Sequence, residues 1–159
     1  SLTEPEMVST ALRVMDAAAE RGVGIVLPTD VVVSDAIEGP SRIEVVSSDA
    51  VPADLMVVDI GPDTREKYAQ EIAGAKTVFW NGPMGVFEVE DFSPGTLAVA
   101  EAVADSSAFS VVGGGESVMA IRRAGVADRI DHVSTGGGAS LEFLSGDTLP
   151  AIAALEIRA

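Results

Sequence analysis

The sequence predicts an α/β fold in which a parallel sheet carries helices on both faces. Along the 159 residues, apolar runs of strand length alternate with stretches that repeat at helical spacing. Three of these runs end directly in glycine-rich segments, and ligand sites of parallel sheets lie beyond the carboxyl ends of the strands. No linker, internal repeat or low-complexity segment breaks the pattern, so we expect a single α/β unit.

The first half of the chain is predicted to hold two helices and three strands. Apolar residues at helical spacing predict a helix over 5–21, and Thr3 with Glu6 has the form of a capping box at its start. Gly22 and Gly24 are expected to end this helix. The other predictions are a strand at 25–27, an alternating edge strand at 43–46, a strand at 55–60 closed by Gly61-Pro62, and a helix at 62–73.

The second half is predicted to repeat a strand–helix alternation. A strand at 76–80 leads into the loop Trp80–Glu88, and Ser93-Pro94 caps and opens a helix that continues to about residue 104. The remaining elements are a strand at 108–112, a helix at 116–123, a last strand at 132–134 and a helix that starts near Ala139.

Composition narrows the functional classes. A hydrophobic fraction of 47% excludes a disordered chain, and zero cysteines exclude disulfides, thiol catalysis and cysteine-held zinc. Twenty-five acids against ten bases give a net charge of −15, which disfavours binding to nucleic acid or to an anionic membrane. This charge fits either of two alternatives, a solvated acidic surface that promotes solubility or adaptation of the source to salt. No apolar run is long enough to cross a bilayer, and we expect a cytoplasmic protein.

Three glycine clusters indicate a ligand site. They are the loop Trp80–Glu88, the segment Gly113–Ser117 and the segment 134–140. Where a strand turns into a helix, the first N–H groups lack partners and carry partial positive charge, which favours a phosphate. Helix caps and turns that need positive φ are the plain structural alternative. The pattern is neither a P-loop nor Gly-x-Gly-x-x-Gly, and this speaks against a dinucleotide-dependent oxidoreductase.

These segments occur in the order and spacing of phosphoglycerate kinase, which the chain resembles over nearly its whole length. The segments 27–33, 59–62 and 134–144 are similar to that family too. The resemblance implies a Rossmann-like three-layer domain, incomplete here, with 1–159 forming most of the C-terminal nucleotide-binding domain. The resemblance also implies that these 159 residues do not include the family's N-terminal domain, which binds phosphoglycerate, or its Gly-Gly-(Ala/Ser)-Lys-Val segment, whose lysine reaches the nucleotide phosphates.

The activity implied is a glycolytic one. A transferase of this family moves a phosphoryl group between 1,3-bisphosphoglycerate and ADP, giving 3-phosphoglycerate and ATP with Mg²⁺, and the full-length enzyme is expected to be a monomer. None of the ten bases lies in a predicted ligand loop, so this chain alone is expected to be inactive. A noncatalytic nucleotide-binding or scaffold fragment is therefore the alternative function.

The resemblance also implies roles for single residues. Glu88 would accept hydrogen bonds from the ribose, Asn81 would lie near the phosphates, and Pro83 with Met84 would border the base and sugar. Glu116 would reach Mg²⁺, although the family generally has aspartate there. The other nucleotide contacts are Gly113, Gly114, Gly115, Ser117 and Thr135, and the cradle for the transferred phosphoryl group is formed by Gly115, Gly136, Gly137 and Gly138.

Two conspicuous side chains are given structural interpretations. Trp80 is expected in the core, since a large residue at a strand end packs more often than it binds ligands. His132 is the single histidine, and without a second histidine or a cysteine it is expected to pack beside the third glycine cluster.

Overall fold

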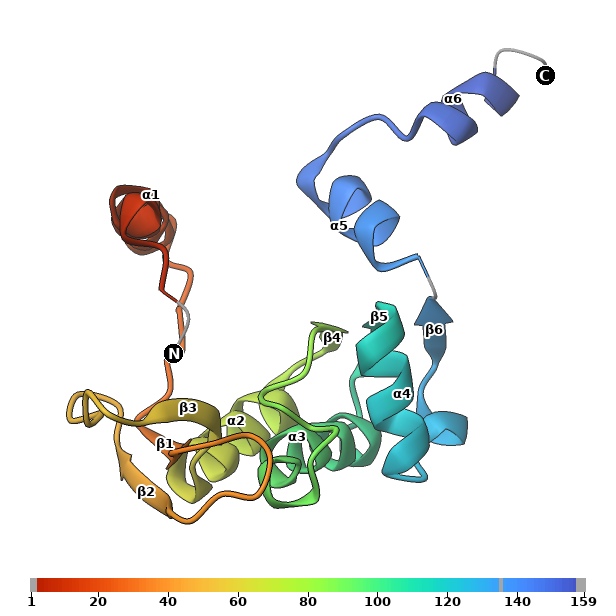
Figure 1. Cartoon of the computed structure of the whole chain (residues 1–159). Coiled ribbons are helices and arrows are strands. Elements are labelled where there is room, and N and C mark those ends of the chain that lie inside the picture. Colours follow the sequence, from red (N-terminus) through yellow and green to blue (C-terminus); the bar gives the residue numbers. More distant parts are fainter. Residues whose placement is uncertain (1–2, 135, 157–159) are drawn as a thin grey trace.

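The computed structural model describes residues 3–134 and 136–156, and within these residues the strands form two three-stranded sheets (Figure 1). The chain begins with η1 (Pro5–Met7) and α1 (Val8–Glu20), which stand away from the sheets. The elements that follow are β1 (Asp30–Ser34), β2 (Ile43–Ser47), β3 (Met56–Ile60), α2 (Pro62–Gly74), β4 (Thr77–Asn81), η2 (Glu90–Phe92), α3 (Pro94–Asp105), β5 (Phe109–Gly113), α4 (Gly115–Arg123), η3 (Ala127–Arg129), β6 (His132–Ser134), α5 (Gly137–Ser145) and α6 (Pro150–Glu156).

The sheet of β4, β5 and β6 is parallel, as predicted, with β5 in the middle. Side chains alternate between its faces. Trp80 of β4 and Val112 of β5 point to one face, where they form the main core with residues of α3 and α4. Phe79 and Val111 point to the other face and line a groove that α5 and α6 also border. Helices therefore lie on both sides of this sheet.

The second sheet, in the order β2-β1-β3, is antiparallel and was not predicted as a separate sheet. Its central strand β1 is buried along its whole length. Val31 and Val33 pack with Leu55 on one face, whereas Val32 packs with Val58 on the other. The predicted edge strand at 43–46 is confirmed as β2, and the strand at 55–60 is confirmed as β3.

The predicted strand at 25–27 is wrong. Ile25 and Leu27 are 43% and 55% exposed, and no described strand pairs with this segment. A side chain of α2 instead hydrogen-bonds to a backbone carbonyl of this segment: the Tyr68 hydroxyl donates to Val26 O at 3.2 Å. A strand needs a neighbouring strand to satisfy its backbone, and in this chain the pairing starts only at Asp30.

The helix boundaries agree with prediction, but two of the predicted caps do not form. The N-terminal helix begins with a 3₁₀ turn, and no side chain caps it, so the Thr3–Glu6 capping box is wrong. Ser93 precedes α3 as expected, but its hydroxyl donates to Glu90 O at 2.8 Å instead of capping the helix. The short helix α6 was not predicted. None of the helices in the described residues is long and apolar enough to span a membrane.

The segments 27–33 and 59–62 meet at the start of α2. The carboxylate of Asp30 accepts the N–H of Asp63 at 3.1 Å and the N–H of Thr64 at 2.7 Å. The Thr64 hydroxyl donates to the same carboxylate at 2.6 Å. A Cβ on Gly61 would lie 2.1 Å from Asp30 Oδ2, so only glycine fits there. Burial opposes the charge of Asp30, but these hydrogen bonds outweigh it and lower its pKa.

Candidate functional site

The three glycine clusters meet at the carboxyl edge of the parallel sheet, as the sequence predicted. Asn81, Gly113 and Ser134 are register partners at the ends of β4, β5 and β6. The Gly114 N–H donates to Ser134 O at 3.2 Å, so the second and third clusters are joined directly. Segments far apart in the sequence thus form one surface beyond the sheet.

Asn81, Gly114 and Gly137 pack closely at the centre of this surface. A Cβ on Gly137 would lie 2.7 Å from Gly114 Cα and 2.9 Å from Gly114 N. A Cβ on Gly114 would lie 2.8 Å from Asn81 Oδ1, and Gly114 has a φ of +89°, which disfavours other residues. Glycine is therefore required for the backbones of the two clusters to approach.

Two helices start beside this contact. Gly114 precedes the first residue of α4, and Gly136 precedes the first residue of α5, so neither helix has a side chain at its N-cap position. The first-turn N–H groups of a helix have no intrahelical acceptors. A Cβ on Gly115 or Gly138 would meet nothing within 4 Å, which leaves open space over both first turns. This arrangement suits an anion. Thr135, which was predicted to bind the nucleotide, lies outside the described residues.

The loop after β4 is fixed by hydrogen bonds to three elements. The Gly82 N–H donates to the Ser117 hydroxyl of α4 at 2.7 Å, and the Met84 N–H donates to the Thr96 hydroxyl of α3 at 3.0 Å. The Val86 N–H donates to Val58 O of β3 at 2.9 Å. Ser117 is buried, so its hydroxyl holds the loop. Pro83, between these anchors, is half-buried.

Trp80 belongs to the core, as expected. It is 6% exposed, and its indole N–H donates to Gly82 O at 2.7 Å. The tryptophan thus packs into the main core at one end and fixes the start of the glycine loop at the other.

Asp59 of β3 supports the loop after β4, a role that the sequence did not reveal. Its carboxylate is fully buried, accepts the Gly95 N–H at 2.6 Å and lies 3.7 Å from Arg65 Nη2. Burial raises the pKa of Asp59 despite these partners. A Cβ on Gly85 would lie 2.8 Å from Asp59 Oδ1, so the loop packs directly onto this carboxylate.

The two acids predicted to bind the nucleotide are both exposed. Glu88 ends the loop, and Glu116 lies in the first turn of α4. In the described part of the chain, neither carboxylate has a hydrogen-bond or ion-pair partner. The described residues also contain no group of three or more His, Cys, Asp or Glu side chains that could hold a metal ion. Mg²⁺ commonly takes one or two protein carboxylates together with phosphate oxygens of a substrate. A free carboxylate at a helix start fits that arrangement.

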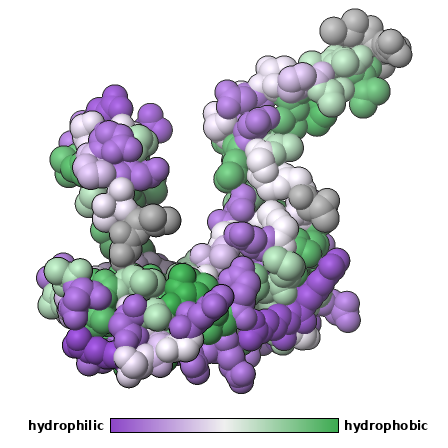
Figure 2. Space-filling view, in the orientation of Figure 1, coloured by the Kyte–Doolittle hydropathy of each residue, from purple (hydrophilic) through white to green (hydrophobic). Residues whose placement is uncertain are grey.

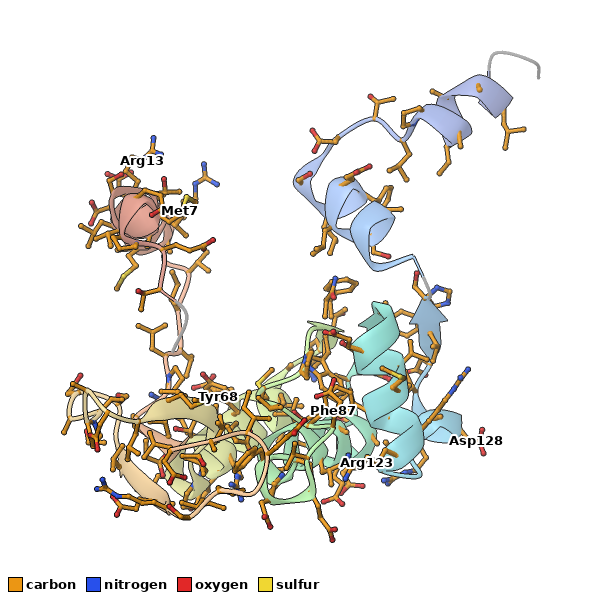
Figure 3. All side chains as sticks on the ribbon, viewed as in Figure 1. Met7, Arg13, Tyr68, Phe87, Arg123 and Asp128 are labelled. Carbon is orange, nitrogen blue, oxygen red and sulfur yellow. The ribbon has the colours of Figure 1, made fainter. Side chains whose placement is uncertain are left out.

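Arg123 reaches the loop from the far end of α4 (Figure 3). Its Nη1 donates to the carbonyl oxygen of Phe87, and it lies 3.4 Å from the carbonyl oxygen of Glu88. The sequence missed this contact because 36 positions separate Arg123 from Phe87. A base in the last turn of a helix is common enough to carry no signal by itself.

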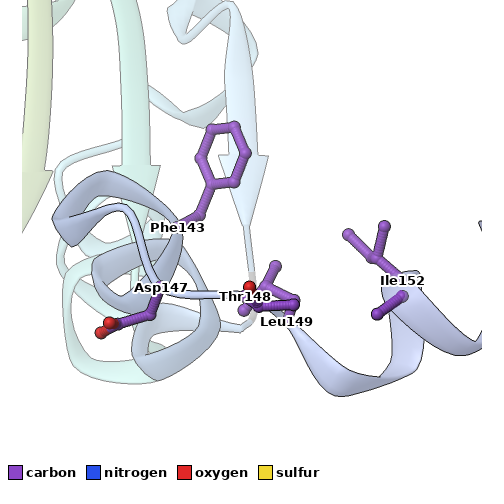
Figure 4. A pocket seen from close by; sticks show the side chains of 6 residues that line it. Phe143, Asp147, Thr148, Leu149 and Ile152 are labelled. Carbon is purple, nitrogen blue, oxygen red and sulfur yellow. The ribbon is translucent and has the colours of Figure 1, made fainter.

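The groove between the sheet and helices α5 and α6 adjoins the third glycine cluster, since Ser134 and Gly136 are among its lining residues. It has a volume of about 490 Å³ and is lined by His132, Phe79 and residues of α5 and α6. His132 is exposed, at the edge of the sheet next to the third cluster. A smaller pocket of about 180 Å³ lies between α5 and α6, with Phe143 and Ile152 in its lining (Figure 4).

Comparison with known proteins decides the family. The sequence model for phosphoglycerate kinase matches residues 1–147. The chain belongs to the phosphoglycerate kinase family. The phosphoglycerate kinase of Herpetosiphon aurantiacus is 55% identical over 155 residues, which are 98% of this chain and 39% of that protein. The phosphoglycerate kinase of Chloroflexus aurantiacus is 52% identical over 159 residues, 98% of this chain and 40% of that protein.

Solved phosphoglycerate kinases have the same fold. The structure from Coxiella burnetii matches with a TM-score of 0.90 and 46% identity, over 96% of this chain and 39% of that one. The structure from Pyrococcus horikoshii matches with a TM-score of 0.80 and 38% identity, over 96% of this chain and 36% of that one. This chain therefore spans about two fifths of the length of the phosphoglycerate kinases that it matches.

Proposed function

We propose that this chain carries the nucleotide site of a phosphoglycerate kinase, which transfers a phosphoryl group between 1,3-bisphosphoglycerate and ADP to give 3-phosphoglycerate and ATP. The observation that carries the proposal is the packing of Asn81, Gly114 and Gly137 at the carboxyl ends of three parallel strands, beside two open helix starts. Such an edge binds nucleotides in other doubly wound sheets.

The proposed roles follow from where the residues lie on this surface. The phosphates lie over the first turns of α4 and α5, where Gly115, Gly136 and Gly138 leave the backbone accessible. Glu88 accepts the ribose hydroxyls, and Pro83 with Met84 borders the base. Transfer of a phosphoryl group depends chiefly on positioning and on compensation of charge, and these N–H groups supply part of both.

Mg²⁺ would be held by Glu116 together with phosphate oxygens of the nucleotide. The ion would neutralise charge on the phosphates when bound. Glutamate carries its carboxylate one methylene further from the backbone than aspartate does, and the exposed position of Glu116 leaves room for that longer side chain.

The rest of the charge compensation is proposed to come from outside this chain. The two lysines of the sequence, Lys67 and Lys76, lie outside the glycine-rich segments, and Arg123 uses its guanidinium on backbone carbonyls. The domain that binds phosphoglycerate and the lysine of the Gly-Gly-(Ala/Ser)-Lys-Val segment would belong to the remaining three fifths of a monomeric enzyme. A noncatalytic nucleotide-binding fragment is the second candidate, favoured because none of the ten bases lies in the glycine-rich segments.

A chimera tests the catalytic proposal. In the Herpetosiphon aurantiacus enzyme, the 155 matching residues would be replaced by this chain. We expect the chimera to turn over 3-phosphoglycerate and ATP in a coupled assay, whereas this chain alone shows only background. A folded chimera without turnover, beside an active parent enzyme, would contradict the catalytic proposal and leave the noncatalytic candidate.

A further inference from the structure

We propose that Arg123 is a positioning residue for the ribose end of the nucleotide site: through the backbone of Phe87 and Glu88 it fixes where the Glu88 carboxylate lies. The proposal rests on the proposed function, because it assigns Arg123 a task in the same site. It adds a residue that touches neither nucleotide nor metal, and it makes α4 the element that sets the spacing between two parts of the site.

The first support is the contact itself. Arg123 Nη1 donates to the Phe87 carbonyl and lies 3.4 Å from the Glu88 carbonyl. Phe87 is 3% exposed and belongs to the main core, whereas Glu88 is exposed. The guanidinium therefore fixes the backbone where the loop leaves the core. The Glu88 carboxylate projects from that fixed point and has no partner of its own in the described chain.

The second support is the other end of the loop. Gly82 donates its N–H to the hydroxyl of Ser117, in the first turns of α4, at 2.7 Å. Ser117 and Arg123 are six positions apart, so a helix places them about 9 Å apart along its axis. One helix thus holds both ends of the glycine loop. Its open N-terminus is the proposed phosphate site, so α4 fixes the ribose acceptor relative to the phosphates.

Arg122 shows that position at a helix end does not explain the contact. It lies next to Arg123 in the last turn of α4, where a positive charge complements the helix dipole. Its side chain has no hydrogen bond or ion pair in the described residues, and it is exposed. The two arginines share the favourable position, and only Arg123 contacts the loop. Arg122 is therefore the matched control.

The experiment measures the preference for the ribose hydroxyls. This chain and its Arg123→Ala, Arg123→Lys and Arg122→Ala variants would be titrated with ADP and with 2′,3′-dideoxy-ADP, each with Mg²⁺. The unaltered chain should prefer ADP by about tenfold or more, the worth of a hydrogen bond to a charged group. Arg123→Ala should lose most of this preference, because its affinity for ADP falls while its affinity for 2′,3′-dideoxy-ADP stays the same. Arg122→Ala should keep it.

Two further variants make the result decisive. Lysine keeps the charge but lacks the planar set of donors, so Arg123→Lys should show an intermediate preference and serves if Arg123→Ala does not fold. The double variant Glu88→Gln with Arg123→Ala should bind ADP about as tightly as Glu88→Gln alone does, because the two substitutions remove the same interaction with the ribose. A full ADP preference in a folded Arg123 variant would overturn the inference alone. No ADP binding by the unaltered chain would overturn the proposed function with it.

Discussion

Asp30 and Asp59 are two buried carboxylates whose surroundings shift their pKa values in opposite directions. Asp30 accepts three hydrogen bonds at the start of α2, which lower its pKa, whereas burial raises that of Asp59. The folded pKa of Asp30 is below its unfolded value. Its stabilisation is therefore complete above the unfolded pKa of about 3.9 and is lost as pH falls through the folded pKa.

Asp30→Asn should therefore destabilise the fold at neutral pH by about 1–3 kcal/mol, since the charged acceptor of the Thr64 and Asp63 donors is lost. The difference from the parent should shrink as pH falls below about 4. Urea unfolding at pH 7 and at low pH measures both effects. Asp49→Asn, at an exposed turn, is the control. Equal stability of Asp30→Asn and the parent at pH 7 would contradict this account of α2.

Glu88 and Glu116 should differ in kinetics when each is changed to glutamine in the chimera. Glu116→Gln should mainly lower kcat, by about tenfold or more, because charge compensation by the Mg²⁺ proposed at Glu116 would matter most in the transition state. Glu88→Gln should mainly raise the KM for the nucleotide, since the ribose is remote from the reacting phosphorus. Glu116→Asp should keep most activity. An unchanged kcat for Glu116→Gln would reduce Glu116 to an acid that complements its helix dipole.

At the scale of residues, the sequence predicted the centre of the site but not its supports. Asn81, Gly114 and Gly137 lie in glycine-rich segments at or just after strand ends, a local pattern that the sequence reveals. Asp59 and Arg123 act on residues 35 or 36 positions away. Such contacts depend on how α3 and α4 pack, which no local spacing encodes.

Among the elements, the starts of α4 and α5 depend on the close contact of Gly114 and Gly137. Gly137→Ala should lower stability by about 1–3 kcal/mol, because its Cβ would lie 2.7 Å from backbone that cannot move aside easily. Gly138→Ala meets nothing within 4 Å and replaces a poor helix former, so it should be neutral or slightly stabilising. Thermal unfolding of the pair checks this, and equal melting temperatures would contradict the close contact.

The strands show where sequence-based prediction of elements ends. The predicted strands found as β2, β3, β4, β5 and β6 each pair with a neighbour in this chain. The apolar run at 25–27 pairs with no strand of the described residues, whereas Asp30–Ser34 pairs on both sides. Composition measures the tendency to form a strand, and only the arrangement of the other strands decides which run forms one.

The whole molecule combines an acidic surface with large uncovered apolar faces. Hydrophilic side chains gather along the lower face of the body in Figure 2, consistent with 25 acids and ten bases. In contrast, Val8, Leu12 and Met15 of α1 are each at least 45% exposed, and α1 buries none of its residues. The apolar groove beside β4–β6 is likewise open. The α1 face lies apart from the contact of the glycine clusters (Figure 1), whereas the groove adjoins the third cluster through Ser134 and Gly136.

Calorimetric titration of this chain with ADP and Mg²⁺ tests the central claim most directly. The glycine surface and Glu88 are present, whereas the lysine of the Gly-Gly-(Ala/Ser)-Lys-Val segment is not. We expect saturable binding at one site, weaker than in the complete Herpetosiphon aurantiacus enzyme by about one to two decades, and weakened further by Glu88→Gln. No saturable binding by the folded chain, or binding that Glu88→Gln leaves unchanged, would contradict the claim that these residues form the nucleotide site.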